Sequence, residues 1–316
     1  MEDDVPMDWT DPDQFAQHHG FLWISEKPGA GKSILIKFLY LHTKKNTNND
    51  ATISFFFNAR GDELKTSTAG MQRSLLVQLV ERFSDLQVVL DNLKVSRIGN
   101  IDVLRDAFSV AISRLGQRRL TCFIDALDEC DQHQVQDMIT YFEGIGEYAI
   151  GQGIKFLVCF SSRHYPYIYI ENGIKLTLED QPGHGHDLEK YMRSKLRVGP
   201  KKRIEEISGE VLQKASGVFM WVVLVVNILN DEFKRGRLFV VKKRLREIPP
   251  KLSDLFKDIL TQDSHNLADL LLCVQWILFA KRPLRLEEFY FVVVSGLDAS
   301  RLSKWDPEET AADDMN

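Results

Sequence analysis

The sequence predicts an α/β fold, in which a parallel sheet with helices on both faces is followed by an all-helical region. Three observations lead to this prediction. Between residues 19 and 180, short β-rich runs alternate with longer stretches of helical spacing, as in βαβ units. The short runs are continuously apolar, which is typical of strands buried on both faces. After about Asp180, every apolar pattern has helical spacing.

The first half contains five expected strands and three expected helices. The strands are short runs of apolar, β-branched or aromatic residues: Phe21–Ser25, Thr52–Phe57, Leu120–Ile124, Lys155–Phe160 and Ile174–Leu178. The helices place apolar residues three and four positions apart: Lys32–Leu41, Ser67–Phe83 and Val103–Leu115.

The second half begins with an expected loop at Gln181–His186, because Pro and Gly interrupt regular structure there. Helical spacing then covers the rest of the chain up to residue 294: Leu188–Leu196, Ile204–Leu229, Leu238–Leu245, Leu252–Leu260, Leu267–Phe279 and Leu286–Val294. We therefore expect a domain boundary near residue 180.

Composition excludes several classes of protein. The 316 residues are 44% hydrophobic and 27% charged with a net charge of −5, so the chain is globular and is not a basic nucleic-acid binder. The four cysteines form no CxxC pair, which argues against zinc and fits a reducing cytosol. The longest apolar run, Val218–Leu229, is shorter than the roughly 20 residues of a membrane span. We expect a cytoplasmic protein that binds neither nucleic acid nor membrane.

A phosphate-binding loop is the strongest motif. The run Pro-Gly-Ala-Gly-Lys-Ser at residues 28–33 lies between an expected strand and an expected helix, the context that a P-loop requires. Glycines let successive N–H groups point at one anion, and the helix N-terminus adds its positive dipole. Lys32 would reach the phosphates and Ser33 would hold Mg²⁺. The candidate nucleotide-binding residues are Pro28, Gly29, Ala30, Gly31, Lys32 and Ser33.

One residue departs from the P-loop pattern G-x-x-x-x-G-K-[ST]. The chain has Glu26 where the pattern has its first glycine. We expect its side chain to crowd the turn and its carboxylate to repel phosphates. The sequence therefore predicts weakened nucleotide binding rather than complete loss, since Lys32 and Ser33 remain.

An acidic cluster follows the expected strand Leu120–Ile124. An apolar strand that ends in Asp is the Walker B pattern, in which Asp125 would orient Mg²⁺ and Asp128 or Glu129 would position an attacking water. A further buried strand ends in Ser-Ser-Arg, which would place Arg163 near the terminal phosphate. A solvated acidic turn and a strand-capping arginine are the ordinary alternatives. The candidate catalytic residues are Asp128, Glu129 and Arg163, and the candidate metal ligands are Ser33 and Asp125.

Several of these segments together resemble the fungal NACHT NTPases, which carry a nephrocystin-type nucleotide domain. The resemblance covers about residues 19–316 and rests on seven segments: Phe21–Ser25, Pro28–Ser33, Phe55–Asp62, Phe123–Cys130, Ser161–Pro166, Ala215–Val225 and Arg282–Phe291. It implies an N-terminal flank at 1–18, a P-loop NTPase domain at 19–180 and a helical lid at 181–262. It further implies a winged-helix-like segment at 263–297, before an acidic tail at 298–316.

The resemblance implies a signalling switch of the STAND class. Such a protein binds ADP at rest, exchanges it for ATP with Mg²⁺, hydrolyses ATP slowly and oligomerises or binds protein partners; in fungi the class is linked to non-self recognition. The expected effector and sensor domains are missing, so we interpret the chain as truncated. The alternative is a nucleotide-dead scaffold or degenerate fragment that acts through protein contacts, which Glu26 favours.

Overall fold

The computed structural model describes residues 7–45, 49–91, 100–165, 168–235, 238–262, 267–280, 282 and 284–297. The chain forms two compact units, Met1–Glu247 and Ile248–Asn316. The expected acidic tail at 298–316 and the start of the expected N-terminal flank lie outside the described residues. The finer domain boundaries expected from the sequence stay predictions.

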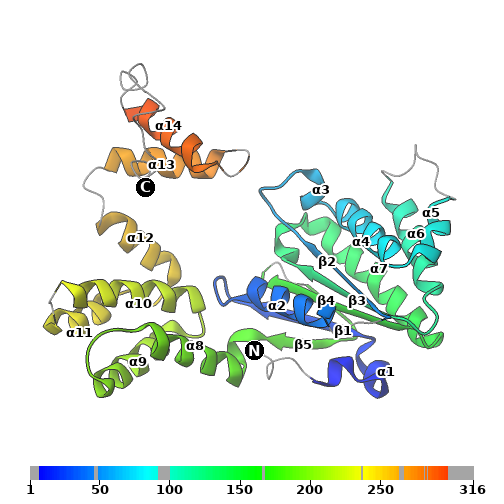
Figure 1. Ribbon diagram of the computed structural model, residues 1–316, viewed down its shortest axis with the longest axis horizontal. Coiled ribbons are helices and arrows are strands. Elements are labelled where there is room, and N and C mark those ends of the chain that lie inside the picture. Colours follow the sequence, from blue (N-terminus) through cyan, green and yellow to red (C-terminus); the bar gives the residue numbers. More distant parts are fainter. Residues whose placement is uncertain are drawn as a thin grey trace. The chain divides into compact units, whose positions relative to one another are not determined.

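The first unit is built on a five-stranded sheet in which every pairing is parallel (Figure 1). The strand order is β2-β3-β4-β1-β5. The strands are β1 (Phe21–Glu26), β2 (Ala51–Phe56), β3 (Arg119–Asp125), β4 (Lys155–Arg163) and β5 (Ile174–Thr177). All five predicted strands and the α/β fold class are thus confirmed. The register places Glu26 beside Arg163 and Phe56 beside Asp125, so the strands end at one edge.

Helices cover both faces of the sheet, as predicted. Alternate residues of β1 divide between two cores: Phe21 and Trp23 belong to one, and Leu22 and Ile24 to the other. The larger core includes residues of α4 (Thr68–Arg82), α6 (Ile101–Ser113) and α7 (Gln132–Gly151). The smaller core includes residues of α2 (Lys32–Lys45) together with Trp9. This alternation is the period-two pattern of a strand buried on both sides.

No predicted element covers α7, although the sequence signals of a helix are present there. Asp131 caps its N-terminus by accepting hydrogen bonds from the N–H groups of His133 and Gln134. Val135, Met138 and other buried residues recur on one face. Short elements complete this half: η2 (Met7–Thr10), η3 (Pro12–Gln14), α1 (Phe15–His18), α3 (Glu63–Thr66), η4 (Ser84–Gln87), α5 (Val88–Asp91), η6 (Leu127–Glu129) and η7 (Leu178–Asp180).

The edge strand β2 is protected by one side chain of α4. Gln78 accepts a hydrogen bond from the Ser54 N–H (3.1 Å) and donates one to the Ser54 carbonyl (2.9 Å). These are the backbone groups that an added strand would use, so Gln78 satisfies and blocks them. Gln78→Ala is expected to lower the free energy of unfolding by about 1 kcal/mol and to increase aggregation on heating. Urea unfolding and light scattering test this, and the exposed Gln87→Ala should change neither.

Four helices follow the sheet in the first unit: α8 (Pro182–Lys195), α9 (Lys201–Ala215), α10 (Phe219–Lys234) and α11 (Leu238–Glu247). The loop predicted at Gln181–His186 is wrong, because α8 begins at Pro182, and proline suits the first helical position. The helix predicted at Ile204–Leu229 is two helices. Ser216 and Gly217 break it, because both have left-handed backbone conformations, with φ of 47° and 81°.

The second unit contains α12 (Leu252–Gln262), α13 (Leu267–Phe279) and α14 (Leu286–Leu297).

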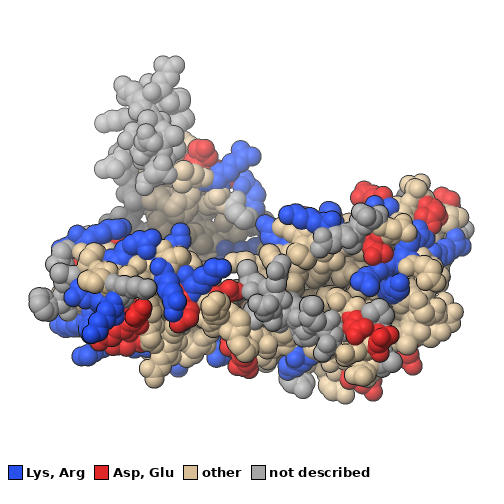
Figure 2. Space-filling view, turned by 60° about the horizontal axis from the view of Figure 1, so that its bottom comes forward, with Lys and Arg blue, Asp and Glu red and all other residues tan. Residues whose placement is uncertain are grey.

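Lysine and arginine side chains of the first unit gather over the helices α9–α11 at the left of Figure 2. Part of this charge is paired, since Lys242 lies 2.6 Å from Glu206 and Lys243 lies 3.8 Å from Glu247. Within the described ranges, none of the helices has both the length and the apolar character needed to span a membrane.

Candidate functional site

The loop between β1 and α2 has the backbone shape of an anion nest. Gly29 and Gly31 adopt positive φ angles of 84° and 118°, which glycine reaches without strain. Among the described residues, the N–H groups of Gly29, Gly31 and Ser33 have no protein acceptor. Lys32 and Ser33 begin α2, so the positive end of the helix dipole faces the loop. Orphaned N–H groups at a helix N-terminus form a binding site for phosphate.

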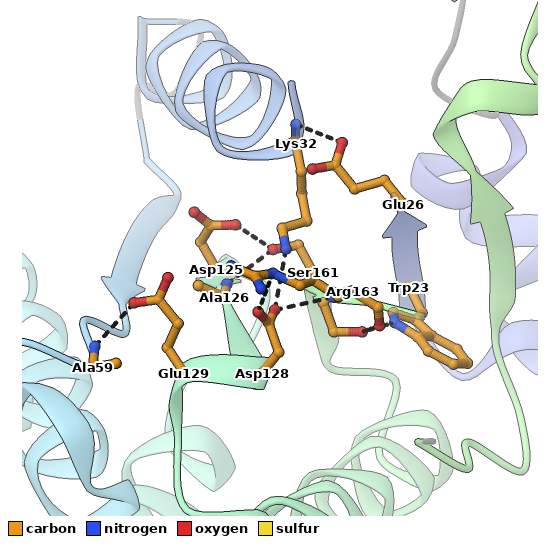
Figure 3. Close-up of polar contacts among 11 residues, drawn as sticks. Trp23, Glu26, Lys32, Ala59, Asp125, Ala126, Asp128, Glu129, Ser161 and Arg163 are labelled. Atoms are coloured by element: carbon orange, nitrogen blue, oxygen red, sulfur yellow. Dashed lines mark hydrogen bonds and ion pairs between the residues drawn. The ribbon is translucent and has the colours of Figure 1, made fainter. Parts of the chain in front are cut away.

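A cavity of about 220 Å³ opens above this loop. The carboxyl ends of the central strands meet here, and Figure 3 shows their polar side chains converging. The cavity is lined by residues of the loop, of the start of α2 and of the segments at the ends of β1, β3 and β4: Glu26, Pro28, Gly29, Gly31, Lys32, Ser33, Ile34, Ala126, Asp128, Glu129 and Arg163. Every residue predicted for the site is among them except Ala30, which lines a neighbouring cavity, and Asp125, which is buried.

Asp128 joins the loop lysine to the strand β4 arginine. Its carboxylate lies 3.2 Å from Lys32 Nζ and 2.9 Å from Arg163 Nε, and it also accepts a hydrogen bond from the Arg163 N–H. The Asp128 side chain is only 5% exposed. Both cations are therefore held over the cavity by one carboxylate, which is fully occupied in positioning them (Figure 3).

Asp125 lies beneath the cavity and is oriented by a residue that sequence reasoning missed. The Ser161 hydroxyl donates a short hydrogen bond to the Asp125 carboxylate and accepts one from the Ala126 N–H (3.1 Å). Asp125 is 2% exposed. The available signal was the position of Ser161, a polar residue that ends the apolar run of β4. An acidic oxygen this deep reaches a cation in the cavity through a water molecule more readily than directly.

Glu129 is held at the rim of the cavity. One of its carboxylate oxygens accepts a hydrogen bond from the Ala59 N–H at 2.9 Å, in the loop that follows β2. The same loop is fixed to the Walker B strand, because the Phe57 N–H donates to the Asp125 carbonyl (3.1 Å). Unlike Asp128, Glu129 is linked by its side chain to backbone rather than to a cation, which leaves it the acid better suited to orient water.

Glu26 does not crowd the turn, contrary to the expectation from the sequence. Its side chain fits within the site, only 5% exposed, and its carboxylate accepts a hydrogen bond from the Lys32 N–H at 2.7 Å (Figure 3). Burial raises the pKa of Glu26 to about 7, and the neighbouring Lys32 opposes this shift. One N–H group of the anion nest is therefore already bonded to a carboxylate of the chain itself.

A second, larger cavity of about 340 Å³ adjoins the loop. It is mainly apolar and lies between the start of α2 and the helices α8 and α10: Ala30, Gly31, Ile34, Leu35, Leu178, His184, Asp187, Lys190, Tyr191, Ser194 and Phe219 line it. The rings of Tyr191 and Phe219 meet edge to face with centroids 5.2 Å apart. No sequence motif pointed to Tyr191, and Phe219 lay in a resembling segment to which no role in nucleotide binding was assigned. Both residues reach the loop only through the packing of distant helices.

Hydrogen bonds tie the phosphate loop to these later helices. The Met220 N–H, at the start of α10, donates to the Gly29 carbonyl at 2.8 Å. Lys27 donates from its backbone to Glu179 (3.3 Å) and from its side chain to the Ser216 carbonyl (3.4 Å). These bonds connect the phosphate loop to the turn at residues 216–217 and to the start of α10.

The sheet is parallel, the phosphate loop follows β1, and β3, which ends in Asp125, is separated from β1 by β4. This arrangement defines the P-loop NTPase fold. The family described as Nephrocystin 3, N-terminal, matches residues 2–163. The chain belongs to this family, which confirms the predicted resemblance to NACHT-type NTPases.

Vegetative incompatibility protein HET-E-1 from Podospora anserina is 29% identical over 316 aligned positions. The alignment covers 91% of this chain but only 22% of HET-E-1. Among solved structures, Cdc6p from Pyrobaculum aerophilum aligns with a TM-score of 0.43 and 12% identity, over 89% of this chain and 76% of its own. The Aeropyrum pernix ORC2 protein aligns with a TM-score of 0.41 and 13% identity, over 95% and 79%.

Proposed function

We propose that this chain is a nucleotide-binding switch of the NACHT type, which binds ATP or ADP with Mg²⁺ and changes the position of its helical region according to the nucleotide. The observation that carries this proposal is the convergence of the unpaired loop N–H groups, Lys32 and Arg163 on one cavity. Donors of this kind in one place match the oxygens of a di- or triphosphate.

Each residue of the cavity has a role in this proposal. The loop N–H groups and Lys32 hold the phosphates, and Arg163 contacts the terminal phosphate from β4. Ser33, together with Asp125 through water, would hold Mg²⁺, which supplies charge neutralisation on the phosphates when bound. Glu129 orients water for slow hydrolysis, while Asp128 positions Lys32 and Arg163.

The adjoining apolar cavity is the proposed site of the base and ribose. It shares Gly31 and Ile34 with the phosphate cavity, so a nucleotide lying across the loop would reach both. Tyr191 and Phe219 offer aromatic surface for the base. Asp187 and Lys190 add polar groups that suit a ribose.

The helical region responds to the nucleotide only if ATP and ADP bind its two arrangements unequally. The bond from the Met220 N–H to the Gly29 carbonyl supports such a coupling, because phosphates that move the loop also move α10. Because the chain belongs to a NACHT-type family, we extend the proposal to cytoplasmic signalling through protein partners or self-association.

Titration of the purified chain with Mg-ADP and Mg-ATP tests the proposal. We expect saturable one-to-one binding with a Kd below about 1 mM. We also expect a rise in melting temperature, since a ligand at 100 times its Kd adds about 2.7 kcal/mol of stability. Tyr191→Ala should weaken ADP binding but leave the binding of inorganic pyrophosphate unchanged. A chain that stays folded and binds no nucleotide, with or without Glu26, would contradict the proposal.

A nucleotide-dead scaffold is the second candidate function, and one observation favours it. The Glu26 carboxylate already occupies the Lys32 N–H. The same titration decides between the two functions, because saturable binding by the wild-type chain excludes the scaffold.

A further inference from the structure

We propose that Glu26 limits the affinity of the phosphate site for nucleotide, as a built-in carboxylate that competes with nucleotide phosphate for the loop. This inference rests on the proposed nucleotide binding and goes beyond it. It assigns a role to Glu26, which stands where the P-loop pattern has a glycine. The pattern therefore has no side chain at the position where this chain has a carboxylate.

The position of the carboxylate is the first argument. Glu26 ends β1, lines the phosphate cavity and accepts a hydrogen bond from the Lys32 N–H at 2.7 Å. This N–H belongs to the first residue of α2, where the helix dipole favours a negative charge. A carboxylate there uses the same donor that a phosphate oxygen would use, so both cannot bond to it at once.

The surrounding charges are the second argument. Arg163 is beside Glu26 in the strand register, but the Arg163 side chain is bonded to Asp128. Lys32 Nζ is likewise bonded to Asp128. The carboxylates of Glu179 and Asp125 both repel the negative charge of the Glu26 carboxylate. Glu26 therefore adds a negative charge to a cavity whose cations are already paired, and an incoming phosphate must overcome this charge.

A dependence on pH follows, and its sign can be worked out. Around Glu26, Lys32 on α2 favours the carboxylate, while burial and the acids Glu179 and Asp125 oppose it and leave its pKa at about 7. A bound phosphate adds negative charge and raises this pKa further, so binding takes up a proton. ADP binding should therefore become about tenfold tighter as the pH falls from about 8 to about 6. The imidazole of His164 lies 2.7 Å from the Glu179 carboxylate and is a further neighbour of this cluster.

Three variants separate the charge of Glu26 from its volume and from its neighbours. Glu26→Gln keeps the shape and removes the charge, and Glu26→Gly removes the side chain. Glu179→Gln is the matched control, because it removes a buried charge that acts on Glu26 but is bonded to Lys27 and His164 rather than to the Lys32 N–H. Binding of ADP and of inorganic pyrophosphate is measured by calorimetry at about pH 6 and pH 8, after circular dichroism has established folding.

At about pH 8 we expect Glu26→Gly to bind ADP and pyrophosphate at least about tenfold more tightly than wild type, with Glu26→Gln in between. Both variants should lose the part of the pH dependence that exceeds the titration of the nucleotide itself. Equal affinity in wild type and Glu26→Gln overturns the role of Glu26 and leaves the nucleotide site standing. An equal gain in Glu179→Gln also overturns it, because overall charge would then explain the effect. If no variant binds either anion, the proposed nucleotide site fails as well.

Discussion

Replacing Lys32 with alanine is expected to weaken ADP binding at least about 100-fold. Lys32 Nζ is 3.2 Å from Asp128 in a site where both side chains are nearly buried, and it is the cation of the phosphate loop. Losing the pair that Lys32 would form with a bound phosphate in this buried site costs about 2–5 kcal/mol of binding free energy, and each 1.4 kcal/mol is a factor of ten in affinity. Calorimetric titration should show this loss whether Lys32→Ala is introduced into the wild-type chain or into the Glu26→Gly variant.

The fold should survive this change, because Asp128 keeps both of its bonds to Arg163. We expect Lys32→Ala to lower the free energy of unfolding by only about 1–2 kcal/mol. Lys37→Ala removes an exposed lysine from the same helix and should leave ADP binding unchanged. Unaltered ADP affinity in Lys32→Ala would show that nucleotide binds elsewhere, whatever the behaviour of Glu26.

The first half of the fold was predictable because its signals are local. Strands such as β1 and β4 are continuous apolar runs, and the phosphate loop is fixed by glycines whose backbone angles few other residues adopt. The ends of β1, β3 and β4 also met as expected, because parallel strands place their carboxyl ends at one edge. These regularities placed Lys32 and Asp128 in one site.

The rest of the site depends on contacts that no local pattern encodes. Tyr191 reaches the loop only through the packing of a helix about which the sequence says little beyond its spacing. Glu26 looked like a steric conflict, yet the structure turns its carboxylate onto the Lys32 N–H. The break at Ser216 was hidden because apolar spacing continues on both sides of it, although the Ser-Gly pair is a helix-ending signal.

That break carries the second large prediction, which concerns Gly217→Ala. Gly217 has a φ of 81°, and an added Cβ would lie 2.6 Å from Glu179 Cβ. The left-handed conformation costs an L-residue about 1–2 kcal/mol, and the overlap adds about 1–3 kcal/mol. Together these terms should lower the free energy of unfolding, measured in urea, by about 2–5 kcal/mol. Gly209→Ala is the matched control in α9, where a Cβ meets no atom within 4 Å and should stabilise by about 0.5–1 kcal/mol.

Gly217→Ala should also weaken ADP binding, because the turn is joined to the phosphate loop. The displaced Glu179 bonds to the Lys27 N–H, the Gly217 carbonyl lies 2.7 Å from His184 Nε2, and α10 begins two residues later with its bond to Gly29. The variant Gln78→Ala lowers stability at the far edge of the sheet and so controls for stability alone. If both variants bind ADP as wild type does under conditions where they are folded, the turn does not couple the helices to the loop. If only Gly217→Ala loses affinity, the connection from α10 to the loop is part of the switch.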